Sequence, residues 1–142
     1  MTRYQLAKLV QWAGTLNSRK RLQKVVFMLQ AAGCPLDAEF YLHHYGTYSE
    51  DLARLTDEMV RKGLLEEETL PAPNGSQYSY RLPAQVNSQL IDLEKTEDGK
   101  SWAGQLAPFA SKAELLLRAN AKELEYASTR SEERRVGKEC RL

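Results

Sequence analysis

The chain has 142 residues, of which 42% are hydrophobic and 27% charged, and its 20 lysines and arginines nearly balance its 19 aspartates and glutamates. This length and composition are typical of one globular domain, and they exclude a disordered chain and a small disulfide-rich scaffold. No hydrophobic run approaches the roughly 20 residues that a bilayer span needs, and the N-terminus has no signal-peptide core, so we expect a cytoplasmic protein with no membrane partner.

The N-terminal part of the chain predicts two amphipathic helices and a short extended segment. Hydrophobic residues recur at i, i+3, i+4 and i+7 over residues 2–13, with Thr2 as N-cap, and again from residue 17 to about residue 32. Gly33 and Pro35 end the second helix. Residues 39–45 are rich in aromatic side chains and are better suited to an extended segment.

A third helix is expected to begin within residues 46–49 and to end at Arg61-Lys62-Gly63. Two N-caps fit its start, either Thr47 with Glu50 in a capping box, or Ser49 alone. The acidic residues at this start suit the positive end of the helix dipole.

A β-hairpin follows this helix. Residues 64–70 and 77–82 are two strand-like runs, the second alternating polar and hydrophobic residues, and Pro73-Asn74-Gly75 lies between them. An Asn-Gly pair between two such runs is the strongest short-range signal for a hairpin.

The remaining residues predict further helices. Pro83 can begin one in which Val86, Leu90 and Leu93 share a face, and residues 97–99 are expected to break it. Residues 101–110 are expected to be helical as far as Pro108, and a final helix capped by Ser111 is expected to run to the end of the domain.

The C-terminal segment has an unusual origin. Residues 130–140 read Arg-Ser-Glu-Glu-Arg-Arg-Val-Gly-Lys-Glu-Cys, which matches one reading frame of a common sequencing adapter. We interpret residues 130–142 as an assembly artefact and expect the natural chain to continue beyond about Thr129; the alternative is an ordinary charged tail. The segment holds five basic and three acidic residues, so 15 basic and 16 acidic residues remain, a net charge of −1. It also holds Cys140, and the remaining thiol, Cys34, fits a reducing cytoplasm.

The order helix, helix, extended segment, helix, hairpin predicts a mostly α, α+β fold of the winged-helix type, with the hairpin as the wing. We expect a winged-helix-like core over residues 1–83 and a C-terminal helical extension of the same domain over residues 84–129. A plain α+β domain with an incidental hairpin is the alternative.

Three segments of the chain have a recognisable pattern. They are Arg19-Lys20-Arg21-Leu22-Gln23-Lys24-Val25-Val26-Phe27, His43-His44-Tyr45-Gly46-Thr47-Tyr48-Ser49-Glu50-Asp51-Leu52 and Lys62-Gly63-Leu64-Leu65-Glu66-Glu67. Together they resemble the bacterial YwgA-like family. The family shows a Lys-Leu-Gln-Lys-like helix, a Tyr-Gly-Pro-Tyr-Ser segment and a Gly-Leu-Leu before a hairpin, and this chain departs from it at Thr47, where proline is usual. The resemblance, which spans about residues 6–129, implies a winged-helix-like fold and no catalytic residues. The chain is more distantly similar to Panacea/SocA-like antitoxin and adaptor domains.

The basic start of the second helix is the main candidate site. Arg19, Lys20, Arg21 and Lys24 lie where free backbone N–H groups can also receive a phosphate, so this end could hold a nucleic-acid backbone, together with Asn74 and Gln77 at the tip of the wing. The alternative is a solvated basic face that pairs with nearby carboxylates.

Acidic residues argue against a conventional DNA-reading helix. The third helix begins with Glu50 and Asp51, and the wing begins with Glu66-Glu67-Glu68, whereas phosphate binding depends on Lys and Arg. Adjacent His43 and His44 in an extended segment would point to opposite faces, so we expect no metal site.

The sequence therefore predicts a non-catalytic regulatory module without a cofactor. Two partner classes stay open: a nucleic acid bound through the residues named above, or a protein partner, as for an antitoxin or adaptor without DNA binding. A homodimer is compatible with either.

Overall fold

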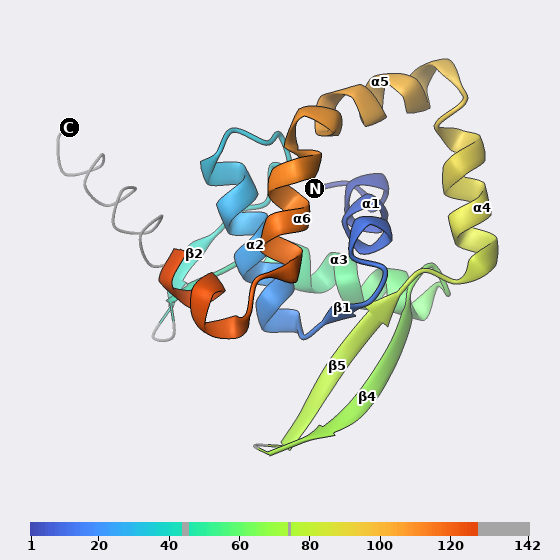
Figure 1. Cartoon of the computed structure of the whole chain (residues 1–142). Coiled ribbons are helices and arrows are strands. Elements are labelled where there is room, and N and C mark those ends of the chain that lie inside the picture. Colours follow the sequence, from blue (N-terminus) through green and yellow to red (C-terminus); the bar gives the residue numbers. More distant parts are fainter. Residues whose placement is uncertain (44–45, 74, 128–142) are drawn as a thin grey trace, which may run out of the picture.

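The computed structural model describes residues 1–43, 46–73 and 75–127, and it is mostly helical with two small antiparallel sheets (Figure 1). In chain order the elements are α1 (Arg3–Ala13), β1 (Leu16–Asn17), α2 (Arg19–Ala31), β2 (Tyr41–His43), β3 (Gly46–Tyr48), α3 (Glu50–Arg61), β4 (Glu66–Ala72), β5 (Gly75–Arg81), α4 (Ala84–Leu93), α5 (Glu97–Leu106), the 3₁₀ helix η1 (Ala107–Phe109) and α6 (Ala110–Arg118). The predicted mostly α, α+β class is confirmed. The predictions made for His44, Tyr45, Asn74 and residues 128–142 lie outside the described residues.

Side-chain caps fix the starts of the first three helices. Thr2 and Gln5 form the full capping box at α1, with Thr2 Oγ1 accepting from the Gln5 backbone N–H and Gln5 Oε1 accepting from the Thr2 N–H. Ser18 caps α2, and Ser49 caps α3 by accepting from the Leu52 N–H. Of the two N-caps that the sequence left open for α3, the structure contains Ser49.

The residues just before Ser49 are a strand and not the first turn of a helix, which corrects the expectation for residues 46–48. They form β3, which pairs antiparallel with β2 in the register Tyr41↔Tyr48, Leu42↔Thr47 and His43↔Gly46. Gly46 has a φ of 106°, which is incompatible with a right-handed helix and typical of glycine. Aromatic and β-branched residues favour the paired strand here.

The C-terminal helices also differ from the prediction. Residues 97–99 do not break a helix but begin α5, because the Thr96 hydroxyl accepts from the Gly99 N–H and caps it. The expected single final helix is interrupted after α6 by Ala119, whose backbone is extended. Asn120 then caps a new helical segment, residues 121–127, by accepting from the Glu123 N–H.

The three-stranded sheet has the order β1-β5-β4 and carries the predicted hairpin. The β4–β5 register runs from Glu66↔Arg81 to Ala72↔Gly75, and the hairpin projects away from the helices (Figure 1). The two-residue strand β1, which the sequence did not predict, pairs Leu16 with Tyr80. This pairing joins the base of the hairpin to the connection between α1 and α2.

One hydrophobic cluster links the N-terminal and C-terminal helices. Its most deeply buried side chains include Leu6, Leu9, Val25, Val26, Leu29, Leu36, Leu52 and Met59, together with Leu106, Ala113 and Leu124. Helix α6 lies against both α1 and α2 (Figure 1). The C-terminal helices therefore hold the start of α2, where the candidate site lies.

Candidate nucleic-acid interface

A surface groove brings together most of the residues that the sequence predicted to bind nucleic acid. The groove has a volume of about 640 Å³ and lies between the start of α2, strand β5 and residues 121–127. Its lining includes Arg19, Lys20, Arg21, Lys24 and Gln77. Gln77 is 53 positions beyond Lys24 in the chain, so the fold itself assembles this site.

The start of α2 is attached to the hairpin through Ser18. The Ser18 N–H donates to the Tyr78 carbonyl oxygen at 2.7 Å, and its hydroxyl accepts from the Arg21 N–H at 3.1 Å. Ser18 has a φ of 89°, a conformation that residues other than glycine rarely adopt. These two hydrogen bonds hold that conformation and keep the groove walls together.

Arg19 connects α2 to α3 and the hairpin. Its Nε donates to the Tyr80 hydroxyl at 2.6 Å, and its Nη2 lies 2.6 Å from Asp57 Oδ1 and 3.1 Å from Glu67 Oε2. Burial lowers the pKa of Arg19, but the hydrogen bonds to Glu67 and Asp57 outweigh it and leave the pKa above its ordinary value. The guanidinium also lies 5.1 Å from the ring centre of Tyr78. Arg19 is therefore engaged within the fold.

Arg21 has a structural role as well. Its Nη1 donates to the Ala119 carbonyl oxygen at 2.5 Å and lies 3.4 Å from the carbonyl oxygens of Leu116 and Leu117. These oxygens are at the C-terminal end of α6, where backbone acceptors lack helical partners and a cation is favourable. Arg21 thus caps α6 and fixes where residues 121–127 begin.

Lys20 and Lys24 share a carboxylate. Glu125 Oε2 lies 2.8 Å from Lys24 Nζ and 3.6 Å from Lys20 Nζ. The Lys24 hydrogen bond and the charges of both lysines lower the pKa of Glu125 below its ordinary value. The side chains of Lys20 and Glu125 are 71% and 60% exposed, so the Lys20 pair lies in water, whereas Lys24 is 18% exposed. The sequence did not predict Glu125, which is about a hundred residues from its partners.

The acidic residues of α3 and β4 are largely paired with cations. Asp51 accepts from Arg54, and Glu66 accepts from Arg81. Glu58 contacts both Arg3 and Lys62, and the hydrogen bonds from Lys62 and Arg3 lower its pKa. The face of α3 is consequently a mixture of both charges.

The thiol at Cys34 is buried, and burial raises its pKa to about 11. A nucleophilic cysteine needs the opposite shift. Among the residues that the structure describes, no group of three or more His, Cys, Asp and Glu side chains could hold a metal ion. The second of the two adjacent histidines lies outside the described residues.

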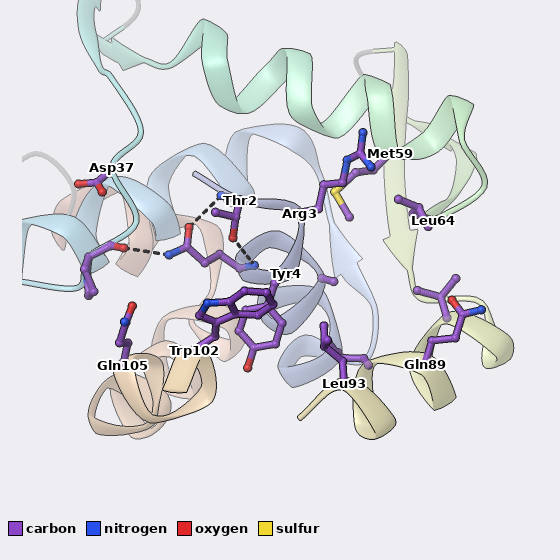
Figure 2. Close-up of a pocket in the computed structure, with 15 residues that line it drawn as sticks. Thr2, Arg3, Tyr4, Asp37, Met59, Leu64, Gln89, Leu93, Trp102 and Gln105 are labelled. Atoms are coloured by element: carbon purple, nitrogen blue, oxygen red, sulfur yellow. Dashed lines mark hydrogen bonds between the residues drawn. The ribbon is translucent and has the colours of Figure 1, made fainter. Parts of the chain in front are cut away.

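A second, largely apolar cavity of about 720 Å³ lies beside α1, α4 and α5, and it was not predicted from the sequence. Figure 2 shows the rings of Tyr4 and Trp102 side by side there, with centroids 5.7 Å apart and planes tilted by 46°. The Tyr4 hydroxyl donates to Glu94 Oε2 at 2.7 Å. Burial raises the Tyr4 pKa most, and this hydrogen bond raises it further. The volume of this cavity is within the range of small-molecule pockets, but the polar groups that line it do not indicate a particular ligand.

Across the described part of the chain, no helix has the length and apolar character that crossing a membrane requires.

Comparison with known proteins supports one of the predicted resemblances. No protein-family model and no solved structure matches the chain. The uncharacterized protein YwgA of Bacillus subtilis strain 168 is 30% identical over 87 residues, which are 61% of this chain and 52% of YwgA. The chain thus spans about half the length of that relative, and its similarity to Panacea/SocA-like domains stays a prediction. The match to YwgA confirms the resemblance of this chain to the YwgA-like family.

Proposed function

We propose that this protein is a non-catalytic regulatory module of the winged-helix type, and that it binds the phosphate backbone of nucleic acid in the groove at the start of α2. Support for the fold type comes from the order α1, β1, α2, α3, β4, β5 and from the sheet order β1-β5-β4, in which the hairpin corresponds to the wing. The observation that carries the function is the convergence of Arg19, Lys20, Arg21, Lys24 and Gln77 on that one groove.

Within the groove, Lys20 and Lys24 are the cations that can exchange partners. Arg19 and Arg21 are tied to the Tyr80 hydroxyl and to backbone oxygens, whereas the lysines contact the exposed carboxylate of Glu125. Exposed ion pairs contribute only about 0–1 kcal/mol, so a phosphate can replace such a carboxylate. The two arginines therefore shape the groove, and the two lysines bind.

A salt titration tests this proposal. Binding of a fluorescent mixed-sequence DNA duplex is measured by anisotropy between low and physiological salt for the wild type and for the double variant Lys20→Gln/Lys24→Gln. Each phosphate contact contributes about 0.9 to the slope of log K against log salt, so the double variant should lose nearly two from the slope. These substitutions avoid the structural arginines and should leave the circular dichroism spectrum unchanged.

The matched control is Lys100→Gln/Lys112→Gln, which removes the same charge from exposed positions on α5 and α6 outside the groove. Its salt slope should equal that of the wild type. Wild-type binding that is insensitive to salt, or equal slopes for both double variants, would exclude the groove as a phosphate site.

A protein partner is the second candidate function, and the paired strands β2 and β3 favour it. Tyr41 and Leu42, neighbours on β2 that point to opposite faces, are 54% and 77% exposed, so each face presents a large hydrophobic side chain to solvent. On this alternative, Leu42→Asp should abolish co-purification of a stoichiometric partner, and Lys20→Gln/Lys24→Gln should leave it intact. Loss of duplex binding in Lys20→Gln/Lys24→Gln, with duplex binding retained in Leu42→Asp, favours nucleic acid.

A further inference from the structure

The helical segment 121–127 lies along the groove that we assign to phosphate binding. Ala121, Leu124 and Glu125 contribute to the lining of the groove, opposite Lys20 and Lys24 (Figure 1 shows the segment, in red, beside the start of α2). The segment therefore forms one wall of the groove.

The carboxylate of the segment contacts both lysines to which we assign phosphate binding. Glu125 Oε2 lies 2.8 Å from Lys24 Nζ, the distance of a charge-assisted hydrogen bond, and it is also the nearest acidic partner of Lys20 at 3.6 Å. The side chain of Lys24 is only 18% exposed in this arrangement. Glu125 therefore takes one of the hydrogen bonds that the Lys24 ammonium could donate to a phosphate.

Helix caps and hydrophobic packing attach the segment to the rest of the fold. Arg21 fixes its beginning by capping α6, and Asn120 caps its first turn. Of residues 120–127, Leu124 alone is buried, with 2% of its surface exposed. Ala127 also packs against the hydrophobic core, so the segment stays attached while the exposed Glu125 side chain can exchange its partners.

We infer that residues 121–127 are an intramolecular competitor for the phosphate-binding groove, with Glu125 as the competing group. This inference rests on the proposed function. The covered state binds nucleic acid weakly, and the groove becomes available when Glu125 is neutralised or the segment leaves Lys20 and Lys24. The nucleic-acid affinity of the protein then depends on how well a ligand phosphate competes with the Glu125 carboxylate for Lys20 and Lys24.

The substitution Glu125→Gln tests this inference in the full chain. It removes the charge, keeps the shape, and lies at an exposed position, so folding should be unaffected. We expect the variant to bind the DNA duplex about fivefold more tightly than the wild type near physiological salt, because an exposed pair of this kind holds about 1 kcal/mol. Glu123→Gln is the matched control, since Glu123 is on the same segment, is exposed, and forms no ion pair with either lysine within the described residues. It should bind as the wild type does.

A second measurement does not depend on nucleic acid. Acetylation of the Lys24 amine by a water-soluble acetylating reagent, followed by peptide mass spectrometry, should be faster in Glu125→Gln than in the wild type and unchanged in Glu123→Gln. Equal acetylation rates in all three proteins would show that Glu125 does not cover Lys24.

The outcomes separate the two proposals. Duplex binding by the wild type with equal affinities for both variants overturns the competitor and leaves the proposed function standing. Binding that is measurable only for Glu125→Gln supports both proposals. Absence of binding by the wild type and by Glu125→Gln overturns the proposed function, and the competitor with it.

Discussion

Replacing Tyr80 with phenylalanine isolates the contact that fixes the hairpin against α2. The Tyr80 ring is 1% exposed, and its hydroxyl accepts a hydrogen bond from Arg19 Nε at 2.6 Å and donates one to Glu67 Oε2 at 2.7 Å. Burial and the Glu67 hydrogen bond raise the Tyr80 pKa, so the phenol stays protonated and keeps this donor throughout the neutral range. Phenylalanine preserves the ring and removes only the hydroxyl.

The expected loss follows from the two charged partners. A hydrogen bond to a charged group contributes about 1.5–3 kcal/mol, but Arg19 and Glu67 remain 3.1 Å apart and their side chains are 40% and 22% exposed, so water recovers part of the loss. We expect Tyr80→Phe to lower the free energy of unfolding by about 2 kcal/mol. That corresponds to a fall of roughly 6 °C in Tm for a chain of this length.

Urea unfolding followed by circular dichroism measures this loss, with Tyr78→Phe as the control. Tyr78 is two positions away on the same strand, it is 36% exposed, and its hydroxyl forms no hydrogen bond with the residues that the structure describes, so this variant should change stability by less than about 0.5 kcal/mol. If the two phenylalanine variants were equally stable, the Arg19–Tyr80–Glu67 contact would not hold the hairpin, and the structural role of Arg19 would have to be abandoned.

Two further predictions concern α5 and the buried thiol. A methyl group on Gly99 would lie 1.8 Å from the Leu93 carbonyl oxygen, so Gly99→Ala should destabilise the protein by about 3 kcal/mol or more. Gly104 on the same helix has open space around it, so Gly104→Ala should stabilise the protein by about 0.5–1 kcal/mol. Thermal unfolding of the two variants measures both effects. The Cys34 pKa of about 11 lies above its ordinary value because burial disfavours the thiolate, so the unfolded chain loses this proton first and stability should fall as the pH rises from about 9 to 11. Urea midpoints across that range should show a smaller fall for Cys34→Ala, and equal falls would contradict the assignment.

Local signals predicted the parts of the fold that are determined within a few residues. Thr2 and Gln5 satisfy each other's backbone N–H groups, and the Asn-Gly pair in the sequence predicts the β4–β5 hairpin, so both features could be expected from spacing alone. The expectation failed at Gly46, where a helix start and a strand start look alike. Pairing with β2 decides between them, and this pairing is a tertiary contact.

The site was predictable in its residues and not in its chemistry. Clustering of Arg19, Lys20, Arg21 and Lys24 in the sequence identified the basic end of α2, and the fold places Gln77 in the same groove. Which anion each cation meets depends on elements far away in the chain, so the position of Glu125 could not be read from local patterns.

The four cations at the start of α2 differ in what a ligand would have to break. Arg19 and Arg21 contact a buried phenol and the free carbonyl oxygens of a helix end, and removing either partner leaves polar groups of the fold unsatisfied. Lys20 and Lys24 contact a carboxylate in water, where one anion replaces another at little cost. The net charge therefore does not predict phosphate binding, because some lysines and arginines are used within the fold and others are available to a ligand. Of these four cations, the two lysines are the ones that can exchange partners, and both contact Glu125 of residues 121–127.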